Sequence, residues 1–596
     1  MRTPTLLLAA GLALAPPGLG ALEQLTFQIE GASEVLEDSL KGASLTRRAR
    51  EDEATTAQDL LAAAQADYRR LVTALYAQGY YSGAVSIEID GREAASIPPL
   101  RAPEEIRQIT VRIDPGPRFA FGRTEIGPLA AGTELPLAFS PGETAEVAAI
   151  RAASAAALEA HRQAGRAKVR IADQRITADH ASRKLDAVLQ IEPGPVLSFG
   201  DLSVSGANRV REDAIRRIAG LPRGETYDPD TLERVTERLR RTGAFRSVAL
   251  REAELANADG TLDIAAQVSE EKRRRLGAGI ESSSVEGLSV SAFWLHRNLF
   301  GGAERFRIEA EVAGIGGETG GVDYRLGARL SRPASLGPDI DGFTFFDLDS
   351  LEEPDYELLS FGVGSGLTWY VAPDLTVEGA VAYERAEQTG ALGTRNYQLL
   401  SFPLSAELER RNDPLDATSG YYLSGEVAPF VGLDGIESGA RVTLDARSYF
   451  GFGEEDRAVF ALRGQLGSVI GPEAQDAPAD YLFYSGGGGT VRGQPYQSLG
   501  VSDAAGSIGG RSFLGVQAEL RVGVTGSIGA VGFLDGGYIG AEEFPDGSSG
   551  EWHAGAGVGL RYDTGIGPIR LDLATPVGED GAGESLELYI GIGQAF

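Results

Sequence analysis

The residue types that most often carry out chemistry are sparse in this chain. The sequence has no cysteine, and its four histidines, His161, His180, His296 and His553, are too scattered for a metal-ligand spacing. No Gly-x-Ser-x-Gly or His-Glu-x-x-His motif is present, and the run Gly486–Gly489 lacks the lysine that a phosphate-binding loop needs. We therefore predict no enzyme activity, no catalytic residue, no metal and no cofactor.

The charge balance argues against nucleic acid as a partner. Lys and Arg number 55 and Asp and Glu number 85, which gives a formal net charge of −30. Binding to phosphate backbones needs clusters of basic residues, and this chain mostly lacks them. The clearest basic run is Lys272–Arg275. Two interpretations of this run remain open: it binds anionic lipid headgroups, or it is a solvated basic linker.

The first twenty residues have the pattern of a secretory signal peptide. Arg2 precedes an apolar run from Leu6 to Ala15, and Gly18 and Gly20 suit the positions before a cleavage site at Ala21. A buried N-terminal helix is the alternative. The apolar run is shorter than the roughly 20 residues that a transmembrane helix needs, and no later segment has that length. We predict an exported protein that would enter a membrane only as a β-barrel.

A repeated pattern organises the first half of the chain. The acidic-Pro-Gly-Pro turn at Ile113–Pro117 recurs at Ile191–Pro195, and proline ends the strand before each turn. Helical periodicity ends in a glycine three times, at Gly79, Gly165 and Gly243. The pattern predicts three modules with the order strand, helix, helix, strand, strand, over residues 22–117, 118–195 and 196–270. A generic α+β domain with chance Pro-Gly turns is the alternative.

Helical signals end near residue 271, and alternation of apolar and polar residues follows. Phe306–Val312, Leu514–Val522 and Leu586–Ile592 are examples. A soluble sandwich shares this alternation, but the export signal, the length of the pattern and the final Phe596 favour a membrane barrel. At roughly 20 residues per strand and connection, residues 271–596 predict about 16 antiparallel strands.

Three longer interruptions are predicted to be loops on one rim of the barrel. They are Pro333–Tyr356, Gly471–Ala479 and Glu542–Gly550. The fold class is therefore three α+β modules followed by an all-β transmembrane barrel.

One Gly-rich stretch carries a family resemblance. Phe483–Gly493, which ends in Val491, Arg492 and Gly493, resembles the inward-folded loop of the POTRA-plus-barrel superfamily, whose members assemble or export proteins at the outer membrane. Phe533–Gly537, with Phe533, Asp535 and Gly536, resembles the strand that faces this loop. The resemblance implies that Arg492 pairs with Asp535 in the lumen. An arginine fork and a carboxylate would hold a loop well where water is restricted. Gln494 stands where the family usually has an aromatic residue.

The chain's end also resembles this superfamily. Tyr589–Phe596, with Tyr589, Gly591, Gly593 and Phe596, is similar to its C-terminal insertion signal, although Gln594 replaces a usual hydrophobic residue. Closing a barrel requires the first and last strands to pair, here about Leu276–Ser282 and Leu586–Phe596. Glycines weaken such a pairing, so Gly279 and Gly591 are expected to mark a lateral seam.

The module count suggests a subfamily. Within the superfamily, three modules and the early Gly79-Tyr80-Tyr81 are similar to TamA, whose family partner TamB is a periplasmic protein anchored in the inner membrane. The resemblance implies a factor in the outer membrane of a Gram-negative bacterium, with periplasmic modules. It would insert or translocate a subset of unfolded outer-membrane and autotransporter-type proteins and would contact outer-membrane lipid. A central assembly factor, a two-partner secretion pore and a role in lipid transfer remain open. An outer-membrane esterase, protease or porin is the alternative from a different class. A porin would not need three modules ahead of the barrel, and an enzyme would show a nucleophile–base pair that is not found in the sequence.

Overall fold

The computed structural model describes nine stretches of the chain. They are residues 22–51, 56–283, 287–317, 320–390, 393–433, 435–503, 506–564, 567–578 and 586–596. The expected signal peptide lies outside them. No helix in these stretches combines the length and the apolar character needed to cross a bilayer. The chain divides into two compact units: residues 1–200, 223–231 and 254–262 form one, and residues 201–222, 232–253 and 263–596 form the other.

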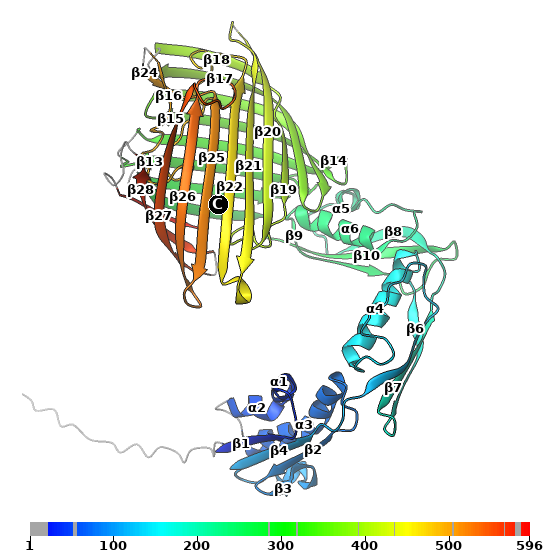
Figure 1. The fold of residues 1–596 in the computed structure, drawn as a ribbon. Helices are drawn as coiled ribbons and strands as arrows, with labels where there is room; N and C mark the ends of the chain where they lie inside the picture. The colour runs from blue at the N-terminus through cyan, green and yellow to red at the C-terminus, as the bar shows by residue number, and fades with distance from the viewer. Residues whose placement is uncertain are drawn as a thin grey trace, which may run out of the picture. The chain divides into compact units, whose positions relative to one another are not determined.

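The first module is a four-stranded sheet packed on helices (Figure 1). Its elements are β1 (Gln24–Ile29), α1 (Glu34–Ala43), α2 (Leu45–Glu51), α3 (Ala57–Ala77), β2 (Ala84–Ile89), β3 (Arg92–Glu93), η1 (Ala94–Ser96), η2 (Pro99–Arg101) and β4 (Gln108–Asp114). The long helix α3 starts at a capping box, in which Thr56 and Asp59 each satisfy the other's backbone N–H. Buried Asp67 of α3 accepts from the N–H groups of Leu45 and Thr46 and so caps α2.

The second module differs from the expected order. It contains β5 (Ala120–Gly127), α4 (Val147–Gln163), β6 (Arg170–Asp179) and β7 (Lys184–Glu192), with sheet order β5-β7-β6. The prediction of two helices is wrong here, because residues 128–146 form no helix. This segment contains Pro128, Pro136 and Pro141. Each of these prolines lacks the N–H that a helix interior requires.

The third module follows the expected order. It contains β8 (Ser198–Ser205), α5 (Glu212–Ala219), α6 (Pro229–Arg241), β9 (Phe245–Glu252) and β10 (Thr261–Glu270), with sheet order β8-β10-β9. Gly220 ends α5 in the left-handed conformation with φ +56°, which a glycine adopts without strain.

The rest of the chain closes into an antiparallel barrel (Figure 1). Its strands are β11 (Arg274–Ser283), β12 (Gly287–Arg297), β13 (Arg305–Ile315), β14 (Asp323–Gly337), β15 (Ile340–Glu352), β16 (Tyr356–Ala372), β17 (Leu375–Gly390), β18 (Gly393–Ser401), β19 (Leu404–Glu409), β20 (Gly420–Gly432), β21 (Gly439–Phe452), β22 (Ala458–Ile470), β25 (Ser512–Gly523), β26 (Ile528–Gly540), β27 (Gly550–Tyr562), β28 (Ile569–Val577) and β29 (Glu587–Ile592). A short helix, η3 (Glu454–Asp456), joins β21 to β22. Strands β18 and β19 both pair with β17 and β20 and form one crossing, interrupted at Pro403. The described barrel therefore has 16 crossings, as predicted.

The barrel presents an apolar band outward and polar side chains inward. On β16, Leu359, Phe361 and Val363 are exposed, whereas the alternate residues Leu358 and Ser360 are buried. Inside, a cavity of about 330 Å³ is lined largely by charged and aromatic side chains, including Arg307, Arg329, Phe345, Asp347 and Glu378. A continuous apolar outer surface of this kind suits lipid rather than water.

One predicted loop is wrong. Residues 333–356 include all of β15 and the end of β14, joined by a short turn at Pro338 and Asp339. The acidic residues that suggested a loop, such as Asp347, alternate with apolar residues and line the lumen. The interruptions at Gly471–Ala479 and Glu542–Ser549 do lie in strand connections, after β22 and β26. The first of these connections also holds the short hairpin of β23 (Val501–Asp503) and β24 (Gly506–Ile508).

The third module is joined to two turns of the barrel. Arg238 of α6 donates to both carboxylate oxygens of Asp339 at 2.6 and 2.8 Å. The guanidinium of Arg241 lies 3.6 Å from the ring centroid of Tyr370. Ala303 and Ala334, which flank barrel turns, are buried in the core of this module. These contacts hold the module against the end of the barrel at which β11 begins.

Candidate functional site: the lumen loop and the barrel seam

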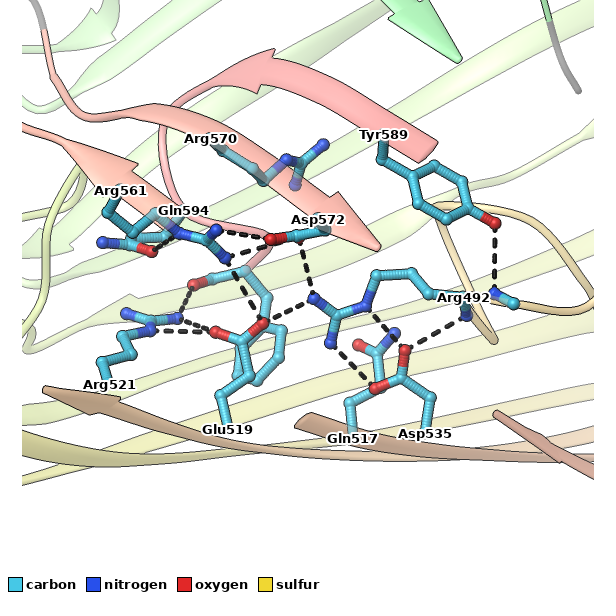
Figure 2. A network of polar contacts seen from close by, with 12 residues as sticks. Arg492, Gln517, Glu519, Arg521, Asp535, Arg561, Arg570, Asp572, Tyr589 and Gln594 are labelled. Atoms are coloured by element: carbon cyan, nitrogen blue, oxygen red, sulfur yellow. Dashed lines mark hydrogen bonds and ion pairs between the residues drawn. The ribbon is translucent and has the colours of Figure 1, made fainter. Parts of the chain in front are cut away.

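Arg492, in the connection after β22, lies in a cluster of buried polar side chains against the barrel wall (Figure 2). The side chain of Arg492 is 1% exposed. Its Nε and Nη2 donate to the two oxygens of Asp535 on β26, at 2.7 and 2.9 Å, and its backbone N–H donates to the same carboxylate at 3.1 Å. The guanidinium also lies 3.6 Å from the ring centroid of Phe533. The structure thus brings together Arg492, Asp535 and Phe533, three residues singled out from the sequence.

The guanidinium of Arg492 also contacts two further carboxylates. Its Nη1 donates to Glu519 of β25 at 2.6 Å and to Asp572 of β28 at 3.3 Å. Arg521 donates to the other oxygen of Glu519 at 2.9 Å, and Arg561 of β27 pairs with Asp572. Three arginines and three carboxylates therefore form a network with no net charge, in which every member is buried (Figure 2). Such balance is needed because an unpaired charge at this depth would cost several kcal/mol.

Glycines let the loop backbone lie directly on the wall. Gly493 has φ +91°, and a Cβ added there would lie 2.7 Å from the backbone of Thr575 on β28. A Cβ on Gly555 of β27 would lie 1.9 Å from the carbonyl oxygen of Arg492. On β26, Gly537 rather than the expected Gly536 makes room for the loop. Its added Cβ would lie 2.8 Å from buried Val491.

The loop is also tied to the last strand. The backbone N–H of Gly493 donates to the hydroxyl of Tyr589 on β29 at 3.2 Å, and Gln494 donates to the carbonyl of Ala554 at 2.7 Å. Gln494 thus uses its amide where an aromatic residue was expected from the family. Arg492, Gly493 and Gln494 together contact strands β25 to β29, which form one side of the barrel closure.

The closure described by the structure is short. The register pairs β11 with β12 from Arg274 to Ser283, whereas among the described residues β11 pairs with β29 at Ser282 and Ser283 alone. Across this seam, Arg570 of β28 reaches over Gly591 to Glu281 of β11 at 3.1 Å. A Cβ at Gly591 would lie 3.3 Å from atoms of both side chains. The seam register therefore places Gly591 beside Glu281, and Gly279 does not face Gly591.

The barrel sequence matches a known family. A model described as the Omp85 superfamily domain matches residues 298–596, and a second, a POTRA model described as a surface antigen variable number repeat, matches residues 197–271. The chain belongs to the Omp85 superfamily. Its third module is the one matched by the POTRA model.

Individual Omp85 relatives are more distant. The chain is 24% identical to the outer membrane protein assembly factor BamA of Neisseria meningitidis serogroup B over 371 residues, which cover 57% of this chain and 45% of that protein. The chain thus spans less than half of this curated relative. In fold it is similar to BamA from Haemophilus ducreyi lacking POTRA domains 1–3, with TM-score 0.61, 15% identity, and coverage of 80% of this chain and 99% of that one. It is also similar to CdiB from Acinetobacter baumannii, with TM-score 0.51, 12% identity, and coverage of 80% and 90%.

Membership of Omp85 places the barrel in a membrane. The apolar band faces the lipid of the outer membrane of a Gram-negative bacterium, and the POTRA region lies in the periplasm. The strand ends near the third module, including the start of β11, are therefore the periplasmic ends.

The C-terminal residues of this Omp85 barrel leave the wall. The last strand ends at Ile592, four residues earlier than expected, and Gly593 turns the chain with φ +96°. Phe596 is 7% exposed and packs among Tyr449, Val459 and Ala461 inside the barrel. Its backbone oxygen accepts from Arg521 at 3.1 Å.

Several residues of the network were missed from the sequence. They are Glu519, Arg521, Arg561, Asp572 and Gln594. The alternation of β25 gives one signal, because Gln517, Glu519 and Arg521 occupy successive lumen-facing positions. No pattern in the sequence shows that Arg561 of β27 donates hydrogen bonds to both Asp572 and Gln594, since these contacts depend on which strands lie beside each other.

A metal site and a reactive Ser–His pair each set requirements on the described residues. Among the described residues, no group of three or more His, Cys, Asp or Glu side chains is placed to hold a metal ion. Ser485 and His553 share a hydrogen bond at 2.7 Å, but Ser485 is completely buried and so has no access to a substrate.

Proposed function

We propose that this Omp85 protein is a specialised outer-membrane assembly factor of the TamA type, which inserts or translocates a subset of outer-membrane and autotransporter-type proteins. The observation that carries the proposal is the short seam. Within the described residues, the edge of β11 between Arg274 and Ile280 has no strand partner on the side of β29. A free edge of this kind offers backbone N–H and C=O groups to a strand of another chain.

The position of the buried charge network would allow the seam to open while the rest of the barrel wall stays folded. Strands β25 to β28 are held together by the buried charges around Arg492, which lie beside the seam but not across it. Among the described residues, one ion pair crosses the seam, between Arg570 and Glu281, whose side chains are 13% and 63% exposed. Solvent around Glu281 screens such a pair, which then contributes about 1 kcal/mol, so the side chains hold the seam weakly.

The modules offer docking edges for a periplasmic partner. In the second module β6 lies at the sheet edge, and most of its ten residues are exposed.

We propose that the first module binds a TamB-like protein that spans the periplasm. Deletion of residues 22–117 should abolish recovery of that partner, and unchanged recovery would refute the assignment.

A disulfide across the seam tests lateral opening. Cysteines at Glu281 and Gly591 should crosslink on oxidation, and the crosslinked protein should fail to support client assembly until it is reduced. The matched control joins β11 to β12 through cysteines at Ala278 and Ala292, which are register partners. That crosslink leaves the seam free and should permit assembly. Full activity of the seam-crosslinked protein would exclude lateral opening.

Gene deletion followed by quantitative outer-membrane proteomics separates the related functions. A viable strain that lacks a narrow set of exported or barrel proteins would support the TamA-type role. Loss of all barrel proteins would instead indicate a central assembly factor, and loss of one secreted protein would indicate a dedicated secretion pore. Altered lipid composition with normal barrel proteins would point to lipid transfer.

A further inference from the structure

Four consecutive cations begin the first barrel strand. Lys272, Arg273, Arg274 and Arg275, which we call the basic segment, are all exposed in a chain whose net charge is −30. Among the described residues, no carboxylate lies within ion-pair distance of any of these four side chains. Other arginines nearby do have such partners, as Arg238 has Asp339 and Arg329 has Glu378 at 2.7 Å. The adjacent carboxylate, Glu271, forms its ion pair with Arg246 at 3.7 Å, so one acidic group beside four cations leaves most of the positive charge of the basic segment unbalanced.

The segment lies at the level where lipid headgroups meet the periplasm. On β11 the even-numbered residues face outward, and Leu276 and Ile280 are 78% and 68% exposed. Arg274 is the next outward position toward the periplasm, about 7 Å along the strand from Leu276. A cation directly below a lipid-facing leucine is placed to meet the phosphate of a lipid whose acyl chains lie against the strand.

A buried histidine and a tryptophan lie beside the segment. His296 of β12 is directly opposite Arg274 in the register. It is 8% exposed, and its Nδ1 is a buried polar atom without a hydrogen-bond partner. Its ring lies 5.8 Å from that of Trp294, which is an aromatic residue of the type enriched at membrane interfaces. The pair of rings at the end of β12 indicates that the start of β11 lies at the interface between lipid and water.

Like charges also gather on the neighbouring strand ends. Arg297 of β12 stands opposite Arg305 of β13, and the backbone N–H of Arg297 donates to the carbonyl of Arg273 at 2.6 Å. Bringing several guanidinium groups together costs free energy unless an anion lies among them.

We propose that the basic segment binds the phosphate of an anionic phospholipid in the periplasmic leaflet of the outer membrane, at the open edge of β11. The absence of a paired strand between Arg274 and Ile280 leaves room for a lipid beside this edge. A membrane lipid fits better than an acidic protein because the cations continue directly into the lipid-facing surface. The proposal depends on the position of the barrel in the membrane and not on its clients.

Native mass spectrometry of the full chain tests this proposal. The protein in neutral detergent is mixed with equal amounts of phosphatidylglycerol and phosphatidylcholine that carry the same acyl chains. The native chain should retain phosphatidylglycerol preferentially. The triple variant Lys272→Gln, Arg273→Gln and Arg274→Gln should lose this preference by about a hundredfold, since each charge near a lipid surface contributes about fivefold.

A matched control and a second variant keep the result interpretable. Arg47, Arg48 and Arg50 of α2 are equally exposed, so their replacement by Gln removes the same charge from the first module and should leave the preference unchanged. If the triple variant does not fold, Arg274→Gln alone should weaken retention about fivefold. Glycerophosphoglycerol, the soluble headgroup, should not displace the lipid. Equal preference in native and triple-variant proteins, an equal loss in the control, displacement by the soluble headgroup, or selective binding of an acidic protein in place of lipid would each overturn the proposal.

Discussion

Removal of Arg492 is the most informative perturbation of the lumen network. In Arg492→Ala, the three buried carboxylates Glu519, Asp535 and Asp572 would face only Arg521 and Arg561. Asp535 would lose two side-chain hydrogen bonds, of 2.7 and 2.9 Å. Breaking a buried ion pair by removing one partner costs about 3–5 kcal/mol. We expect the loop to detach locally while the barrel wall stays folded.

Amide hydrogen exchange measures this detachment where it occurs. The backbone N–H of residue 492 donates to Asp535, and that of Gly493 donates to Tyr589. A loss of about 3–5 kcal/mol lowers the protection of these amides by about two to three and a half orders of magnitude, since each 1.4 kcal/mol is tenfold. Client assembly, measured with the same variant, should fall in parallel.

A double-mutant cycle assigns the effect to the pair. Asp535→Ala and the double variant complete the cycle, and we expect a coupling of about 2–3 kcal/mol, because both groups are buried and in direct contact. The control pair is Arg307 with Glu309, which is also at 2.7 Å but is 44% and 57% exposed. Its removal should leave the loop amides nearly unchanged. Additive effects of Arg492→Ala and Asp535→Ala, or wild-type protection in Arg492→Ala, would refute the reasoning.

Three further perturbations follow from the same structure. In Gly493→Ala the new Cβ would collide with the backbone of Thr575 at 2.7 Å, so loop-amide protection should fall at least tenfold, whereas Gly489→Ala, which meets nothing within 4 Å, should have no effect. Burial acts to raise the pKa of Asp339, but Arg238 and Arg241 more than offset it and hold the pKa below its ordinary value of about 3.9. The contact between α6 and the barrel turn should therefore be complete above that value and be lost as the pH falls through the lowered pKa, while Asp339→Asn should remove this dependence in hydrogen exchange of α6. Arg570→Gln should speed hydrogen exchange of the Ile590 amide by less than about fivefold, and high salt should abolish this effect. A larger effect would mean that the ion pair of Arg570 with Glu281 contributes more than about 1 kcal/mol to the seam.

The barrel and its inward loop could be predicted because their signals are local. Alternation along each strand specifies which residues face the lumen, so Gln517, Glu519 and Arg521 could have been assigned to the lumen from the sequence. The resemblance of Val491–Gly493 to a known loop suggested a pairing of Arg492 with Asp535, and the structure places these residues in contact.

The remaining features depend on distant segments of the chain. The position of Gly591 beside Glu281 follows from the seam register, which local patterns do not specify when one strand has only six residues. The acidic residues of β15 suggested a loop, because acidic side chains are common in loops and also line a polar lumen. In the second module, the order assigned to all three modules predicted a first helix, but Pro128, Pro136 and Pro141 stand in the segment where it would lie.

The attachment of the third module determines which side of the seam can move. Because Arg238 and Arg241 hold the turn between β14 and β15, and only Glu271 to Arg273 separate β10 from β11, the first strand is anchored at its periplasmic end to a folded module. Within the part of the chain that the structure describes, the last strand makes no contact with this module and is held by the lumen loop and network, through Tyr589 and Phe596. An opening motion would therefore displace the C-terminal strands, and a client strand added to β11 would keep a fixed orientation to the third module. Growth of a client sheet from a stationary edge would let each new hairpin enter the membrane at the same place.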